Sequence, residues 1–77
     1  MSIQEFASLY DRMNDTEMKE AIIFTLSQRQ SDRTAMDKLF DIAKNEKDAE
    51  LRKKAIFWLG QSHDPRVQQF LIDLINK

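Results

Sequence analysis

The stretch Asp48–Gln61, which reads DAELRKKAIFWLGQ, repeats the stretch Asp15–Gln28, which reads DTEMKEAIIFTLSQ, after 33 residues. Acidic, basic, aromatic and apolar residues fall at matching positions in the two stretches. One residue then drops out of the next loop, and an offset of 32 residues places Asp32 on Asp64. A period of this size with helical patterning inside it is typical of stacked repeat proteins.

The spacing of apolar residues is helical throughout, and the chain holds one glycine and one proline. We predict five helices, over residues 2–13, 16–28, 33–45, 49–59 and 65–77. In the second helix we expect Met18, Ile22 and Leu26 to face the core. Gly60 is expected to end the fourth helix, and Pro65 to occupy the first position of the fifth, where a missing amide hydrogen costs nothing.

Four aspartates share one position, because each stands directly before a predicted helix. They are Asp15, Asp32, Asp48 and Asp64. An aspartate in this position accepts hydrogen bonds from the first free amides of the helix and complements the helix dipole. We therefore interpret the four carboxylates as structural N-caps and not as paired carboxylates of a catalytic site.

Short loops predict that neighbouring helices are antiparallel. The expected fold is all-α, an α-solenoid of about five helices in a single domain over residues 1–77. Residues 1–14 form the second helix of a partial repeat, residues 15–47 the first whole repeat and residues 48–77 the second.

Composition narrows the classes of function. The formal net charge is −1, from 12 basic and 13 acidic residues, so no strong field attracts nucleic acid or an anionic membrane. The chain has no cysteine, which excludes thiolate metal sites and disulfides. The longest apolar run, Ala21–Phe24, is far shorter than the roughly 20 residues of a membrane span. No signal peptide is recognised at the amino terminus, and the compartment stays open.

The segment Asp48–Arg66 resembles the bacterial HEAT-repeat pattern, and in particular the short repeats of the phycobilisome-lyase-like group. It has the acidic cap, the Leu-Arg pair Leu51-Arg52, the Leu-Gly pair Leu59-Gly60 and an Asp-Pro-Arg turn. His63 stands where that family usually has glycine. The resemblance covers essentially the whole chain and implies a right-handed superhelical stack of antiparallel helix pairs, usually a protein-binding scaffold.

Applying one register to the first, third and fifth helices predicts ladders of polar side chains along their outer face. We expect this face to be a groove, polar and mildly acidic, with two apolar anchors, Phe40 and Ile72. The residues predicted to contact a partner are Asp37, Phe40, Asp41, Lys44, Gln69, Ile72 and Asp73. A basic or amphipathic peptide segment is the expected ligand, and a solvated helix face is the alternative interpretation.

Two further pairs of residues recur in both repeats, and the chain has a single histidine. Lys19 and Arg52 are expected to bond turn aspartates or helix ends, with anion binding as the alternative. Phe24 and Phe57 are expected to pack between repeats, with an exposed aromatic patch as the alternative. His63 is expected to be an exposed turn residue with positive φ, because a single histidine cannot form a zinc site.

We therefore expect a non-enzymatic protein-interaction scaffold, a segment of a longer solenoid, with neither cofactor nor metal. The alternative is a structural or self-associating spacer, with homo-oligomers forming through uncovered solenoid ends. A lyase-type or nucleic-acid-binding HEAT protein ranks below both, and no membrane partner is expected.

Overall fold

The computed structural model describes residues 2–76, and five α-helices account for most of them. They are α1 (Ile3–Arg12), α2 (Thr16–Ser27), α3 (Arg33–Asn45), α4 (Ala49–Gln61) and α5 (Arg66–Ile75). Between residues 2 and 76 there is no β-strand. The all-helical prediction with five helices is confirmed, and the predicted bounds are met within one or two residues.

Aspartate caps start α2, α3 and α4, as predicted. The carboxylates of Asp15, Asp32 and Asp48 each accept hydrogen bonds from the backbone amides two and three residues further on, at 2.9–3.5 Å. Such a cap contributes about 1 kcal/mol to helix stability. The starts of these three helices are therefore fixed by contacts that span only three residues of the chain.

The start of α5 differs from the prediction. Pro65 precedes the first helical residue, Arg66, and so does not occupy the first helical position. Asp64 still acts as a cap in part, because its carboxylate accepts from the Arg66 amide at 2.8 Å and its carbonyl from the Val67 amide at 3.1 Å.

The end of α4 also corrects a prediction. Gly60 does not stop the helix, which continues to Gln61 and is closed by Ser62. The amide and hydroxyl of Ser62 both donate to the Leu59 carbonyl, at 3.1 and 2.7 Å. Within residues 2–76 no residue has a positive φ, so Gly60 is an ordinary helical residue and the expected positive φ of His63 is wrong.

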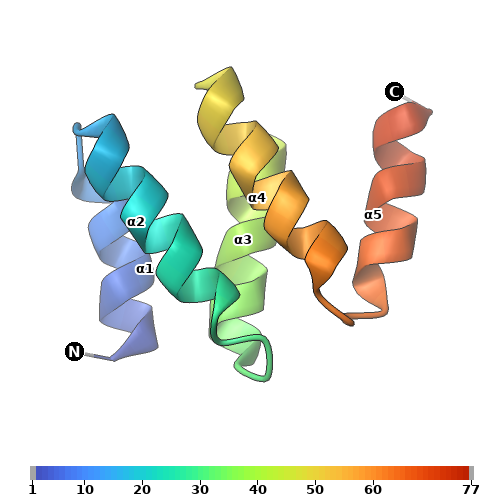
Figure 1. Ribbon diagram of the computed structural model, residues 1–77, viewed down its shortest axis with the longest axis horizontal. Helices are drawn as coiled ribbons and strands as arrows, with labels where there is room; N and C mark the ends of the chain where they lie inside the picture. The colour runs from blue at the N-terminus through green and yellow to red at the C-terminus, as the bar shows by residue number, and fades with distance from the viewer. Residues whose placement is uncertain (1, 77) are drawn as a thin grey trace.

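The helices alternate in direction, and α2 and α4 lie side by side in front of α1 and α3 (Figure 1). Direct helix packing joins α1 to α2 and α3, α2 to α3 and α4, and most extensively α3 to α4. Helix α5 stands at the edge of this four-helix group (Figure 1).

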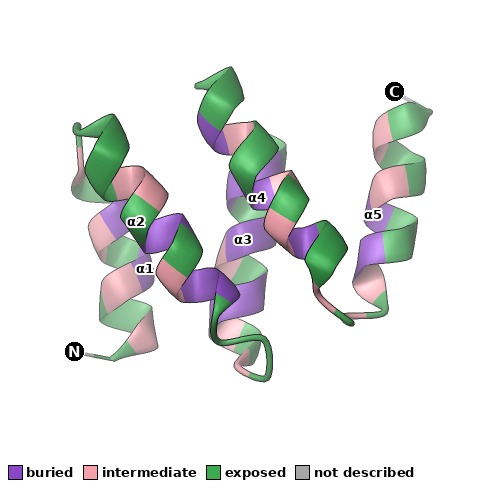
Figure 2. Ribbon diagram, in the orientation of Figure 1, coloured by how far each residue is buried: buried purple, intermediate pink, exposed green. Residues whose placement is uncertain are grey.

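The core runs between the two layers, where the buried faces of α2, α3 and α4 meet (Figure 2). Its fully covered side chains are Ile23, Leu26, Met36, Leu39, Leu51 and Leu59. Met18, predicted to belong to it, is half exposed, whereas its counterpart Leu51 is buried. The reason is that α4 has α2 beside it in the front layer, and α2 has no described helix on the corresponding side (Figure 1).

A polar junction around Glu46 ties α1, α2 and α4 to the end of α3. The Tyr10 hydroxyl donates to the Glu46 carboxylate, and the Lys19 ammonium lies 3.7 Å from it. Arg52 donates to the Glu46 carbonyl at 2.9 Å. Lys19 and Lys38 also stand over the Tyr10 ring, 5.0 and 5.5 Å from its centroid. The prediction that Arg52 bonds a helix end is confirmed, and Lys19 uses a carboxylate at the same end.

The junction shifts the pKa of both of its acidic members. Burial raises the pKa of Tyr10, and the hydrogen bond to Glu46 and the negative charge of Glu46 raise it further. Burial on its own would raise the pKa of Glu46. The effect of burial is outweighed by the hydrogen bond from Tyr10, the amides of Asp48 and Lys47 and the charge of Lys19. The pKa of Glu46 therefore lies below its ordinary value. Tyr10 is thus the donor and Glu46 the ionised acceptor.

We predict that Tyr10→Phe lowers the free energy of unfolding by about 1.5–3 kcal/mol at neutral pH, the range for hydrogen bonds to charged groups. Because the folded pKa of Glu46 lies below the unfolded value, its stabilisation is complete above about pH 4.5 and is lost as pH falls through the folded pKa. The difference between wild type and variant should therefore shrink below that pH in urea titrations. A difference that stays constant down to the acid transition would contradict the assignment.

We also predict that Ile23→Val lowers the free energy of unfolding by about 0.5–1.5 kcal/mol, because it removes a methyl group from a fully buried position. Ile75→Val is the matched control, since the same methyl group is lost from an exposed side chain, and its effect should stay within about 0.5 kcal/mol. Equal losses in urea denaturation would show that the core is placed wrongly.

Candidate binding groove between α3 and α5

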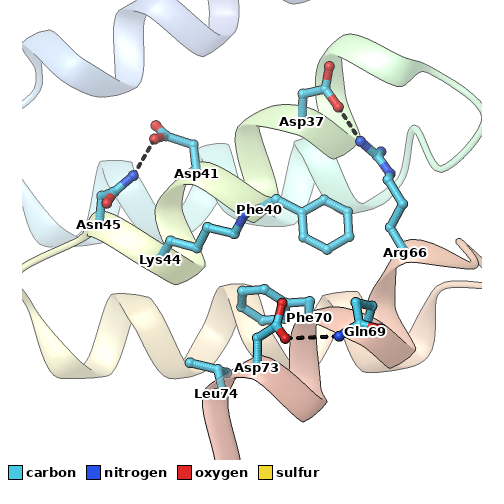
Figure 3. A pocket seen from close by; sticks show the side chains of 10 residues that line it. All are labelled: Asp37, Phe40, Asp41, Lys44, Asn45, Arg66, Gln69, Phe70, Asp73 and Leu74. Atoms are coloured by element: carbon cyan, nitrogen blue, oxygen red, sulfur yellow. Dashed lines mark hydrogen bonds and ion pairs between the residues drawn. The ribbon is translucent and has the colours of Figure 1, made fainter. Parts of the chain in front are cut away.

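A groove of about 740 Å³ lies between α3 and α5. Its volume lies within the range of ligand pockets, about 300–1,000 Å³. Ten residues line it, all from α3 and α5: Asp37, Phe40, Asp41, Lys44, Asn45, Arg66, Gln69, Phe70, Asp73 and Leu74 (Figure 3). We call it the α3–α5 groove.

Arg66 lines the groove and bridges its two sides. Its guanidinium donates to Asp37 of α3 at 2.6 Å and to Asp64 at 2.8 Å, and it lies 4.7 Å from the centre of the Phe40 ring. The hydrogen bond from Arg66 lowers the pKa of Asp64, and the same bond raises the pKa of Arg66. One cation thus bridges the turn before α5 and the face of α3, and we call it the Arg66 clip.

The floor of the groove is aromatic. The rings of Phe40 and Phe70 meet edge to face with their centroids 5.5 Å apart, a favoured arrangement for aromatic pairs. Both are largely buried, Phe40 to 7% exposure. The Lys44 ammonium lies 5.9 Å from the centre of the Phe70 ring, so its side chain covers part of the floor.

Two further carboxylates line the groove. Asp41 accepts from the side-chain amide of Asn45 at 2.8 Å and from Lys38 at 3.2 Å, and these contacts, the Asn45 bond first, hold its pKa below the ordinary value. Asp73 accepts from the side-chain amide of Gln69 at 2.9 Å (Figure 3). Among residues 2–76, Asp73 has no lysine or arginine within salt-bridge distance.

Six of the seven residues predicted to contact a partner line this groove, namely Asp37, Phe40, Asp41, Lys44, Gln69 and Asp73. Ile72 does not. It lies on another face of α5 and is 43% exposed. Phe40 is not the exposed anchor that we expected, because Phe70 and Arg66 cover its ring.

Four residues that line the groove were not among those predicted, namely Arg66, Phe70, Asn45 and Leu74. Phe70 also belongs to the hydrophobic core, and Leu74 packs against it. The missed signal for Arg66 is its spacing, since an arginine two residues after a capping aspartate can fold back onto the cap, as it does here.

The other predicted features lie elsewhere. Phe24 packs against Trp58 with ring centroids 5.5 Å apart, which is the expected contact between the two front helices. Phe24 and Phe57 are nevertheless more than half exposed, so both interpretations hold in part. His63 is exposed, as predicted.

Two further features concern metal binding and membrane insertion. Residues 2–76 contain no cluster of three or more histidine or carboxylate side chains placed to share a metal ion. Over the same residues, no helix has the length and hydrophobicity needed to cross a membrane.

Comparisons with models of protein families, with curated proteins and with solved structures returned no match to this chain. The HEAT resemblance therefore depends on the sequence pattern alone, and the residues of the groove carry the functional argument.

We predict that Arg66→Ala loosens α5 selectively, because it removes the ion pairs with Asp37 and Asp64 and the contact with the Phe40 ring. The pairs are partly exposed, so the expected loss is about 1 kcal/mol. Amide hydrogen exchange in α5 should then become about fivefold faster, while exchange in α2 and α3 stays unchanged. Uniform acceleration through all helices would contradict a local role for the clip.

Proposed function

We propose that this chain is a HEAT-type α-solenoid segment that acts as a non-catalytic protein-interaction module, and that the α3–α5 groove binds a basic amphipathic helix. The observation that carries the proposal is an aromatic floor in a groove that carboxylates also line. A groove with these features suits a helix that presents an apolar face and a lysine or arginine beside it.

The ligand's apolar side chains would lie over Phe70, because Phe70 and Arg66 already cover the ring of Phe40. To do so they must displace Lys44, whose ammonium lies over Phe70. The volume of the groove suits a few side chains from one helix face and not the whole helix. Affinity then depends on how well those few side chains fill the space above the floor.

The ligand's cations would meet Asp73 and Asp41. Asp73 is the stronger partner, because Gln69 is its only side-chain hydrogen-bond donor among residues 2–76. Asp41 is shared with Lys38 and Asn45. Exposed ion pairs of this kind contribute modestly to affinity, but they select the sign of charge and fix the orientation of the helix.

We predict that a fluorescent amphipathic peptide of about 14 leucine and lysine residues, long enough to form a marginal helix, binds this protein with salt-dependent affinity. A leucine–glutamate peptide with the same apolar pattern should bind at least about tenfold more weakly, since charge repulsion exceeds the 1.4 kcal/mol that a factor of ten requires. Fluorescence polarisation measures both.

Three variants locate the binding site. Asp41→Lys with Asp73→Lys should weaken the lysine peptide at least about tenfold. The control Glu20→Lys with Glu50→Lys makes the same change in net charge on α2 and α4, outside the groove, and should have a much smaller effect. Lys44→Ala should strengthen binding, because it uncovers Phe70 and removes a repelling charge. Equal effects of the two charge reversals, or weaker binding by Lys44→Ala, would exclude the groove as the site.

A further inference from the structure

An aromatic cluster lies on the exposed side of α2 and α4, and none of its residues lines the α3–α5 groove. The Phe24 ring of α2 meets the Trp58 ring of α4 edge to face, with the centroids 5.5 Å apart. The Phe57 ring meets Trp58 in the same manner at 5.1 Å. Phe24 and Phe57 are nevertheless 51% and 56% exposed. The three rings therefore form one continuous, partly exposed surface, and we call it the front patch.

Opposite charges flank the front patch on its two helices. Four residues before each phenylalanine, and so on the same side of each helix, stand Glu20 in α2 and Lys53 in α4. These two residues are counterparts in the internal repeat, 33 positions apart, just as Phe24 and Phe57 are. The two repeats thus carry the same aromatic residue at one position and opposite charges at the other.

The charges of Glu20 and Lys53 are only loosely engaged within the chain. Glu20 lies 3.9 Å from Lys54, and Lys53 lies 3.6 Å from Glu50. All four side chains are at least 38% exposed. Ion pairs as exposed as these contribute little to stability, so each residue can exchange its partner at small cost.

Matching positions of α2 and α4 stand at nearly the same level. The two helices run parallel and side by side (Figure 1). Phe24 meets Trp58 and Glu20 meets Lys54, in each case the residue directly after its counterpart in the repeat. One residue of a helix corresponds to a rise of only about 1.5 Å. The two stripes of exposed residues are therefore in register.

A surface with these properties is complementary to a copy of itself. A two-fold axis parallel to the two helices would place α2 of one copy on α4 of another, with both helices running in the same direction. Phe24 would then lie on Phe57 of the second copy, and Glu20 would lie opposite Lys53 of the second copy. Each of these contacts would occur twice, so apolar groups face apolar groups and opposite charges face each other.

We propose that the front patch is the interface of a homodimer, in which α2 and α4 of one copy lie on α4 and α2 of the other. A second copy is the occupant because the charges of this face complement the same face after a two-fold rotation. The dimer is weak, since helices of 12 and 13 residues are only about 20 Å long and Glu17 would face Glu50 of the other copy. The proposal is independent of the function proposed for the α3–α5 groove.

Sedimentation equilibrium of the whole protein at low salt tests the association. Between about 10 µM and 1 mM, the average mass should rise from that of one chain toward that of two, with a dissociation constant on the order of 100 µM. Trp58 is the single tryptophan of the chain and belongs to the patch. Its fluorescence emission should therefore change over the same range of concentration.

Charge reversal identifies the interface. Glu20→Lys alone and Lys53→Glu alone should each weaken the dimer at least about tenfold, because each places like charges opposite each other at two points. The double variant restores opposite charges and should dimerise within about threefold of wild type. The control Lys47→Glu makes the same change at an exposed residue between α3 and α4 and should change the dissociation constant less than about twofold.

Two results would overturn the proposal. A protein that stays monomeric up to about 1 mM would mean that a second copy does not cover the front patch. A dimer that responds equally to Lys47→Glu and Lys53→Glu, or that the double variant fails to restore, would place the contact on another surface. Neither result bears on the leucine–lysine peptide, because the residues reversed here do not line the α3–α5 groove.

Discussion

The carboxylate of Glu46 is the point on which the arrangement of α1 to α4 depends. It receives the Tyr10 hydroxyl from α1 and the Lys19 ammonium from α2, and its own backbone carbonyl receives Arg52 from α4. Hydrophobic packing supplies most of the stabilisation, but it is not directional, and stripes of leucine and isoleucine can slide by a turn at modest cost. A polar junction that is satisfied in only one register removes that freedom. Each of its members needs the others. If one is removed, the carboxylate or phenol left unpaired in this partly buried place costs more free energy than the paired cluster contributes.

Helix α5 lacks any comparable junction, and the candidate groove follows from that difference. No helix pair that includes α5 packs as extensively as the pairs among α1 to α4. The Arg66 clip and the Phe40–Phe70 contact join α5 to α3, and Leu71 and Leu74 of α5 are partly buried against the core. The groove lies beside these contacts and is lined by both apolar and polar side chains.

The sequence predicted what is decided locally. The starts of three helices could be predicted from the aspartates before them, Asp15, Asp32 and Asp48, because a capping carboxylate acts on amides only two and three residues away. The prediction that Gly60 ends α4 was wrong, because a glycine by itself does not force the chain to leave a helix. The helix ends only where Ser62 bonds back to the Leu59 carbonyl. The groove was predicted in large part because helical periodicity places Asp37, Asp41 and Lys44 on one face. Ile72 was misplaced, because it does not line the groove, whereas Phe40 does line it but is covered by Phe70 and Arg66. The contacts that Arg66 makes with Asp37 and the Phe40 ring depend on tertiary packing, which helical periodicity does not contain.

The bond between Tyr10 and Glu46 also bears on how the chain folds. It joins residues 36 positions apart, whereas most helix contacts join neighbours in the chain. Closing so long a loop costs only slightly more entropy than closing a short one, but the ends must first be brought within reach. Helices α2, α3 and α4 bring them there through contacts of short sequence separation, which favour rapid folding. The junction at Glu46 therefore adds one contact of long sequence separation to a group of helices that otherwise pack mainly on their neighbours in the chain.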